Sequence, residues 1–415
     1  MGPGIVVVLT WLGAGDIVNS AMAGGNYGYA LMWVFVLCLM VRYLFVSTVA
    51  KYQLSNERGE TVLGGLVKVH PLYAPFVLLC VLGVGHAVGA YLLTGAAVAC
   101  VRLTGLGHPR VWAVVLCVLA YYIAFRPVYR RIEKVFFFLV GVLSICFLTL
   151  AAWSGPSPGG LAKGLLGFAV PETVGRFDTT TLMLSMLGAV AGGLANLMYP
   201  YFIREKGWIT AEHRRVQQYD LLLGIAVLIL LDLAVWVVGA EILHPRGIHV
   251  VDVESLARLL GEVLGGFGTT LFYVAILAAL FSNILGTASA YAYLGSDAYG
   301  YWRSGEAKTE DREATSRRIY RPIVIWIIVT PLAWPLLGQS DFVGLTLLVN
   351  AAQVVLIPVL VTGLWIITAR SDYIGAKYRN RWWENLAIGL LLLLGCISTY
   401  FALAKMVERI SGLLS

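Results

Sequence analysis

Long apolar stretches alternate with short polar connections over the whole length of the chain. A bilayer core of about 30 Å needs roughly 20 apolar residues per helix, so each long stretch predicts a membrane-spanning helix. The sequence contains eleven of them, and the eighth is long enough to run past the membrane as helix. We expect the spans near residues 3–24, 28–50, 72–98, 110–127, 132–153, 179–203, 217–243, 256–294, 320–338, 343–369 and 383–407.

The composition excludes several classes of protein. Hydrophobic residues make up 59% of the 415 positions and charged residues only 13%, against about 45–50% and about 25% in soluble domains. A soluble fold could not cover so much apolar surface with polar groups. Soluble enzymes, nucleic-acid-binding proteins and disordered chains are therefore excluded, and the expected surroundings are a lipid bilayer.

The positive charges predict the topology. With the N-terminus placed inside, Lys and Arg favour the inner connections over the outer ones by roughly 2.5 to 1, as the positive-inside rule asks. The first stretch has neither a basic leading region nor a small-residue cleavage site, so we expect a retained span and no signal peptide. The sequence thus predicts a multi-pass protein of the cell membrane, in a bacterium the plasma membrane, with a cytoplasmic N-terminus.

Two spans are interrupted by residues that disfavour helix. The first contains Gly13-Ala14-Gly15-Asp16, and the sixth contains a glycine pair at 192–193 followed by Pro200. Backbone freed at membrane depth must face protein or a water-filled cavity. The two breaks lie five spans apart, and paired breaks of this kind point to a transporter site at a repeat interface.

We therefore expect one all-α transmembrane domain over 1–415, with two related halves and broken helices 1 and 6. The first repeat covers about 1–153 and the second about 179–369, and an extra helix follows at about 383–407.

Asp16 is the clearest candidate for a functional residue. A carboxylate beside a broken helix in the bilayer is costly unless it is compensated. It can serve as a cation ligand or a proton carrier, helped by the Gly13 carbonyl, or it can pair with an arginine such as Arg42. Asp232 and His86 are further polar positions inside spans and can serve a proton relay, although a lone histidine is more often a packing residue.

The second break and the tenth span add oxygen donors. Asn196 and Tyr199 can contribute amide, backbone or phenolic oxygen, although Asn196 can instead cap the half-helix. Gln353, one turn after Asn350, can complete the site or form an interhelical hydrogen bond. Weaker candidates for the metal site are Asn19, Ala195, Met198 and Tyr201.

The sequence shows no catalytic constellation. Zinc-protease, hydrolase and Walker patterns are missing, and the six cysteines lie in apolar stretches without the spacing of a zinc site. We expect neither an enzyme nor a bound cofactor. The oligomeric state stays open, with a monomer as the working expectation.

The opening of the chain resembles a known family. Gly2-Pro3-Gly4, the polar break and the run Ala23-Gly24-Gly25-Asn26-Tyr27-Gly28-Tyr29 are similar to the start of the NRAMP (natural resistance-associated macrophage protein) divalent-metal transporters. Weaker similarities follow at the broken sixth span, at Arg317-Arg318-Ile319 and at Gln353…Pro358. The resemblance implies a LeuT-like fold of two inverted five-helix repeats, here with an eleventh helix.

The chain departs from the family at its metal-binding motifs. Without gaps, the family's D-P-G-N falls on Gly13–Asp16, although another register matches Asp16 and Asn19 to its first and last positions. The M-P-H motif falls on Tyr199-Pro200-Tyr201, and a shifted register keeps Ala195 and Met198 as the A-x-x-M pair. The acidic residues that the family carries in span three for proton passage have no counterpart here.

These departures lead to an expectation about the substrate. Oxygen ligands suit hard cations and a thioether suits softer metals, so we expect a hard-ion-leaning site that takes Mn²⁺ or Mg²⁺. If Met198 faces the cavity, a manganese or iron preference follows instead. We expect import by alternating access with no strict proton coupling. The alternatives are a LeuT-fold carrier of amino acids or organic amines, and a receptor or membrane enzyme that transports nothing.

Overall fold

The chain folds into a bundle of helices. The computed structural model describes residues 14–125, 129–192, 194–304, 309–338 and 341–414, and all regular structure within these ranges is helical. Each of the eleven predicted stretches overlaps an apolar helix, which confirms the predicted all-α architecture. The helices are α2 (Ala14–Tyr27), α3 (Met32–Ser55), α5 (Tyr73–Thr104), α6 (Pro109–Ala124), α7 (Tyr129–Trp153), α9 (Thr179–Leu187) with α10 (Tyr199–Glu205), α11 (Arg214–Val238), α12 (Val253–Ser304), α13 (Thr309–Val329), α15 (Phe342–Gln353) with α16 (Ile357–Ala369), and α18 (Trp382–Leu414).

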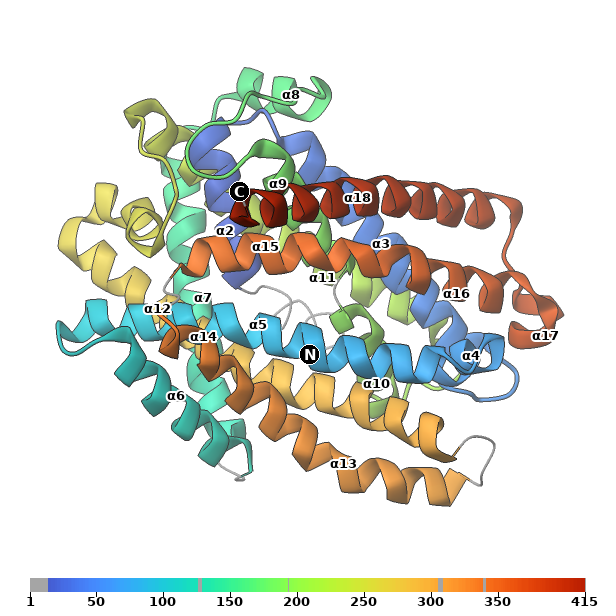
Figure 1. Cartoon of the computed structure of the whole chain (residues 1–415). Helices are drawn as coiled ribbons and strands as arrows, with labels where there is room; N and C mark the ends of the chain where they lie inside the picture. The colour runs from blue at the N-terminus through green and yellow to red at the C-terminus, as the bar shows by residue number, and fades with distance from the viewer. Residues whose placement is uncertain (1–13, 126–128, 193, 305–308, 339–340, 415) are drawn as a thin grey trace.

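Most of these helices can cross a bilayer. Seven helical segments of the described chain have the length and hydropathy of a membrane span, and three further apolar helices are shorter. In Figure 1, α18, α15 with α16, α5 and α13 extend across the view. Helix α18 packs on α16, and α12 packs against both α5 and α13.

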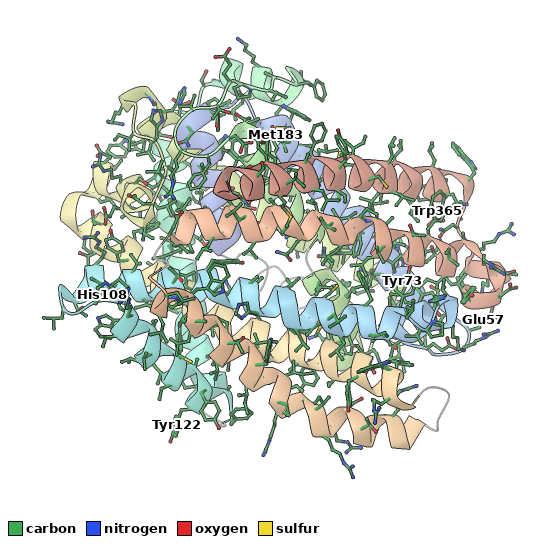
Figure 2. The ribbon with its side chains drawn as sticks, in the orientation of Figure 1. Glu57, Tyr73, His108, Tyr122, Met183 and Trp365 are labelled. Atoms are coloured by element: carbon green, nitrogen blue, oxygen red, sulfur yellow. The ribbon has the colours of Figure 1, made fainter. Side chains whose placement is uncertain are left out.

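The outer helices present apolar side chains to their surroundings. In the most apolar part of α18 only 28% of the residues are buried, whereas 61% are buried in the most apolar part of the segment that contains α15 and α16. Exposed Leu390, Leu393 and Tyr400 continue this apolar surface along α18. Helix α6 is similarly peripheral, with His108 and Tyr122 near its two ends in Figure 2. These faces suit contact with lipid chains.

Short helices in the connections were not predicted. Helix α4 (Val62–Val69) starts after Thr61, whose hydroxyl accepts a hydrogen bond from the Gly64 amide at 3.0 Å. Helix α8 (Pro158–Leu166) starts in the same way after Ser157. A hydroxyl at the first position satisfies an otherwise unpaired backbone donor, so these caps define where both helices begin.

Helix α12 is less regular than the sequence predicts. The helical residues run from Val253 to Ser304, past both ends of the predicted span, but Gly265 has φ +61°. A positive φ is accessible to glycine at little cost and breaks the helix geometry there. The expectation of one long continuous helix is therefore wrong at Gly265, while the extension beyond the membrane span is confirmed.

Candidate metal site

The sixth span is broken as predicted, in two consecutive irregular turns. Helix α9 ends at Leu187 and is followed by a wide π turn, η1 (Gly188–Gly192). A tight 3₁₀ segment, η2 (Leu194–Met198), leads into α10, which has Pro200 in its first turn. Proline is tolerated there because the first turn of a helix has no intrahelical acceptor for its missing amide. The break therefore confirms the predicted discontinuous sixth helix.

The π turn exposes backbone carbonyls, and an arginine binds them. Arg42 of α3 donates from Nε to the Val190 carbonyl and from Nη2 to the Ala189 carbonyl, each at 3.2 Å. Asn196 also donates from Nδ2 to the Val190 carbonyl, at 3.0 Å. The amide of Asn196 thus binds a carbonyl of the π turn as a donor, which differs from the accepting role of the predicted helix cap. A positive charge supplied by the protein lies where freed carbonyls could bind a cation.

The beginning of α2 approaches the same break. Asp16 is 7% exposed and Asn19 only 4%. The Ser185 hydroxyl of α9 donates to Asn19 Oδ1 at 2.7 Å. The contact joins the first span to the half-helix that precedes the break in the sixth. Asn19 therefore lies against the half-helix that precedes the break in the sixth span. The predicted break of the first span at Gly13–Asp16 begins outside the described residues, and α2 is helical from Ala14 onward.

The tenth span reaches this point through Asn350. A Cβ placed on Gly15 would lie 2.9 Å from Asn350 Nδ2, and one on Gly188 would overlap the Asn350 carbonyl oxygen. The side chain of Asn350 accepts a hydrogen bond from Gln353 Nε2 at 3.3 Å. Small residues at 15 and 188 thus let the first and sixth spans approach α15 closely. The amides of Asn350 and Gln353 are brought to the breaks together.

The electrostatics of this region depend on three charged side chains. Asp16, Arg42 and Asp232 are all buried. The charges of Asp16 and Arg42 are close enough to act on the Asp232 carboxylate, and both also act on Cys38, one turn before Arg42. Two carboxylates and one guanidinium form a cluster that we call the charged core. It contains more acidic than basic groups.

The structure places the remaining predicted residues as follows. Gly13 and the side chain of Ala195 lie outside the described residues. Met198 is buried. The Tyr199 hydroxyl accepts from Gln217 Nε2 at 3.0 Å, in a hydrophobic cluster of its own with residues of α3 and α11. The Tyr201 hydroxyl donates to Asp297 of α12 at 2.8 Å. Ligand roles for these residues stay predictions.

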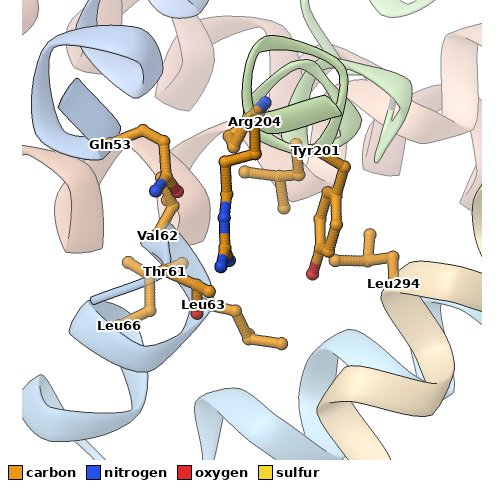
Figure 3. Close-up of a pocket in the computed structure, with 10 residues that line it drawn as sticks. Gln53, Thr61, Val62, Leu63, Leu66, Tyr201, Arg204 and Leu294 are labelled. Carbon is orange, nitrogen blue, oxygen red and sulfur yellow. The ribbon is translucent and has the colours of Figure 1, made fainter. Parts of the chain in front are cut away.

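A pocket lies beyond the break, along α10 (Figure 3). Its lining comes from α4, η2, α10, α12 and the end of α3. Tyr201 and Arg204 project into it opposite Thr61 and Gln53. Polar and aliphatic side chains therefore both line a small space next to the broken span.

The donor set is limited in kind. Among the described residues, no three His, Cys, Asp or Glu side chains are grouped so that they could hold a metal ion. The donors near Asp16 include carboxylate, amide and carbonyl oxygens, and the thiol of Cys38 also lies within reach of its charge. Ser185 and the carbonyl-binding role of Arg42 were missed by sequence reasoning, although an arginine inside an apolar span was a signal that could have drawn attention to it.

A second polar cluster lies between α5 and the segment that follows α13. Trp334 donates from Nε1 to His86 Nε2 at 2.8 Å. Since an indole nitrogen only donates, the His86 proton lies on Nδ1, which is 2.9 Å from Thr330 Oγ1. Thr330 in turn donates to the Trp326 carbonyl at 2.7 Å. His86 is thus a neutral, fully hydrogen-bonded packing residue, as the less functional of the two interpretations predicted.

Comparison with known families decides the relationship. The family model for natural resistance-associated macrophage protein-like (Nramp) proteins matches residues 4–404. The chain belongs to the Nramp family. Since Nramp proteins are transporters, membership confirms that this one is not an enzyme.

Individual Nramp relatives are distant but cover most of the chain. A divalent metal cation transporter, MntH, of Brucella suis biovar 1 is 26% identical over 93% of this chain and 84% of its own length. The MntH protein of Bacillus subtilis is 22% identical over 70% of this chain and 68% of its own. At this level of identity, individual site residues need not be shared.

Solved structures agree with the predicted fold. A mutant of the Eremococcus coleocola manganese transporter superposes with a TM-score of 0.75 at 17% identity, covering all of this chain and 87% of that one. The transporter MhsT in complex with L-phenylalanine gives a TM-score of 0.58 at 15% identity, with 97% of each chain covered. The fold is therefore the LeuT-like one that the Nramp resemblance implied.

Proposed function

We propose that this Nramp protein moves divalent metal cations across the membrane by alternating access, and that Asp16 is the central ligand of its site. The observation that carries the proposal is the meeting of Asp16, the unwound η1 turn and the Asn350–Gln353 pair. A buried carboxylate beside freed carbonyls and amide oxygens is a suitable environment for a cation. Relatives named as divalent metal cation transporters support the same substrate class.

The donor chemistry supports a hard cation such as Mn²⁺ or Mg²⁺. Asp16 supplies a carboxylate, Asn19, Asn350 and Gln353 supply amide oxygens, and the Gly13 carbonyl is a further candidate. Oxygen ligands of this kind favour Mg²⁺, Ca²⁺ and Mn²⁺ over soft metals. Magnesium keeps several waters and needs only one or two carboxylates, so the same site can take it as well as manganese. Asn196, Tyr199, Met198 and Tyr201 are secondary in this assignment.

The proposed movement is inward and is driven by the membrane potential. Two positive charges entering at an inside-negative potential gain about 2.3 kcal/mol per charge for each 100 mV. Span three offers no carboxylate for a proton path, since it has Val88, Gly89 and Leu92 there. His86 in the same span is engaged on both ring nitrogens. Import without strict proton coupling follows.

The test is uptake into proteoliposomes that contain metal-sensitive dyes. Mn²⁺, Mg²⁺, Ca²⁺ and Cd²⁺ are offered to wild type, to Asp16→Ala and to Asp372→Ala, whose aspartate is exposed on a connection. We expect saturable uptake of Mn²⁺ and Mg²⁺ by wild type and Asp372→Ala. Loss of a ligand carboxylate should lower uptake by Asp16→Ala at least tenfold, because uncompensated removal of such a group costs several kcal/mol.

Two results would contradict the proposal. Absence of divalent uptake by folded wild type would exclude metal transport, and competition assays with organic amines and amino acids would then test the alternative substrates. Normal uptake by Asp16→Ala would remove Asp16 from the site. A simultaneous pH-sensitive dye inside the vesicles reports whether protons enter with the metal.

A further inference from the structure

A second carboxylate in the membrane part of the molecule has no assigned role. Asp232 lies in the last third of α11, well inside the candidate membrane span Ala211–Arg246, and is 2% exposed. Its Oδ1 atom has no hydrogen-bond partner among the described residues. An ionisable group so deep in a span is rare and expensive unless it takes part in a site or an ion path. The Asp232 Oδ1 atom is therefore a buried acceptor that no described donor satisfies.

The packing of α11 against α2 brings Asp232 towards Asp16. Helices α2 and α11 approach closely where Gly24 faces the Trp236 carbonyl, and a Cβ on Gly239 would lie 2.8 Å from the Gly25 amide nitrogen. The two segments run in the same direction here, since Gly24 lies against the Trp236 carbonyl and the later Gly28 lies against the ring of the later His244. Asp232 lies one turn before Trp236, which brings it towards the Asp16 end of α2.

The charges of the core do not balance. Asp16 and Asp232 supply two carboxylates, and Arg42 supplies one guanidinium that acts on Asp232. The guanidinium also donates from Nε and Nη2 to the carbonyls of Val190 and Ala189. Two buried carboxyl groups therefore share one guanidinium beside the break in the sixth span. A divalent cation would supply the further positive charge that two ionised carboxylates need, and carboxylate oxygens are suitable ligands for it.

We propose that Asp232 is a second carboxylate ligand of the transported cation, and that Arg42 holds the two carboxylates and the η1 carbonyls in place while the site is empty. The inference rests on the proposed metal transport and deepens it, because a site with two carboxylates discriminates more strongly for hard cations than one with Asp16 alone. The competing explanation is that Asp232 only neutralises Arg42.

A thiolate substitution distinguishes a ligand from a counter-ion. Asp232→Cys and Asp232→Ser differ only in sulfur and oxygen, so their comparison isolates the donor atom. If Asp232 contacts the metal, Asp232→Cys raises the ratio of Cd²⁺ to Mn²⁺ uptake at least tenfold over Asp232→Ser, because sulfur favours the softer ion. Equal ratios in the two variants overturn the proposal. Exposed Asp372→Cys serves as the control for nonspecific thiol binding.

A paired substitution tests the counter-ion explanation and guards against unfolding. Asp232→Asn should raise the KM for Mn²⁺ at least tenfold, with Asp372→Asn unchanged. The double variant Arg42→Gln/Asp232→Asn removes one charge of each sign, a change that buried pairs often tolerate. If Asp232 is a ligand, the KM of the double variant stays raised. Recovery of the wild-type KM in the double variant shows that Asp232 only balances Arg42, and overturns the proposal.

The wild-type and Asp16→Ala controls separate this proposal from the proposed function. Wild-type uptake that depends on Asp16 but not on Asp232 defeats the second-ligand proposal alone. No divalent uptake by folded wild type defeats metal transport and the second ligand together. Each protein is first examined by size-exclusion chromatography, and uptake is expressed per monodisperse transporter.

Discussion

The charged core is buried and the His86 cluster is half-buried within the membrane part of the molecule, and the two differ in how their polar atoms are satisfied. Around His86, each ring nitrogen has a partner of the right kind, and the adjoining hydroxyl is also bonded. Around Asp16, the carboxylate oxygen Oδ1 of Asp232 has no hydrogen-bond partner among the described residues. The first cluster is complete without a ligand, and the second is not.

The position of a polar residue inside the membrane part is therefore by itself a weak indicator of function, and the hydrogen bonding of its polar atoms is more informative. A satisfied group such as His86 contributes to packing specificity, whereas an incomplete set of buried donors and acceptors costs free energy. Natural structures contain few such groups, and each needs a reason. The reason proposed for the charged core is the cation that it binds transiently.

Of the changes considered, removal of Arg42 should have the largest effect on stability. Arg42→Gln leaves two buried carboxylates without their positive neighbour, and the loss of one partner of a buried charge set costs about 3–5 kcal/mol. We expect a large drop in the thermal unfolding temperature in detergent. Mn²⁺ should recover part of it, because the metal replaces the lost positive charge. Arg58→Gln, at an exposed position, should unfold like wild type. Equal stability of Arg42→Gln would contradict the account of the charged core.

Replacement of His86 should lower the stability of the protein but leave metal uptake unchanged. His86→Phe leaves the Trp334 indole without its acceptor and the Thr330 hydroxyl without its donor, so stability should fall by about 1–3 kcal/mol. Mn²⁺ uptake per folded transporter should equal that of wild type, because the cluster takes no part in the site. Thermal unfolding and proteoliposome uptake measure the two effects separately. Lost uptake with intact folding would mean that the satisfied cluster is functional after all.

A smaller effect is expected at the beginning of α9. Asp178 accepts hydrogen bonds from the Thr181 amide at 3.0 Å and the Thr181 hydroxyl at 2.6 Å. Partial burial acts to raise the pKa of this carboxyl, but the bonds from Thr181 and the charge of Lys405 outweigh burial and lower it below its ordinary value of 3.8. The ionised cap therefore stabilises the protein above that value, and the contribution is lost as the pH falls through the lowered pKa.

Two variants of Asp178 test how much this cap contributes to stability. Asp178→Ala removes the cap and should cost about 1 kcal/mol at neutral pH, whereas Asp178→Asn keeps a good N-cap residue. The deficit of Asp178→Ala relative to wild type should shrink as the solution is acidified below the ordinary Asp pKa. Thermal unfolding across this range measures the deficit. A deficit that does not change with pH would contradict the electrostatic part of the explanation.

Much of the fold could be predicted because helix length and apolar content are local properties. Hydropathy alone located the seven long and three shorter apolar helices of the described chain, and Gly192 and Pro200 marked the break in the sixth span. The break at Gly265 was not predicted, since a single glycine inside an apolar run is often tolerated in a helix. Short helices such as α4 were also missed, because their caps matter more than their hydropathy.

The site could be predicted in part. Asp16 was recognised from the cost of a buried carboxylate, and Gln353 from its place beside Asn350. The directions of Tyr199 and Tyr201 could not be predicted, because the π turn and the 3₁₀ segment before them shift the 3.6-residue period by which helix faces are assigned. The binding of Arg42 to the Val190 carbonyl depends on the approach of two distant spans, which no local pattern encodes.

The position of a bound metal ion is the most direct test of whether Asp16 is a ligand of the transported cation. Crystals of the wild-type protein grown with Mn²⁺ and measured for anomalous scattering would place the ion without any assumption about transport. The account predicts a single strong peak at the broken helices, within about 2.5 Å of a carboxylate oxygen of Asp16, which disappears in Asp16→Ala. A Mn²⁺ peak bound elsewhere, with this region empty, would contradict it.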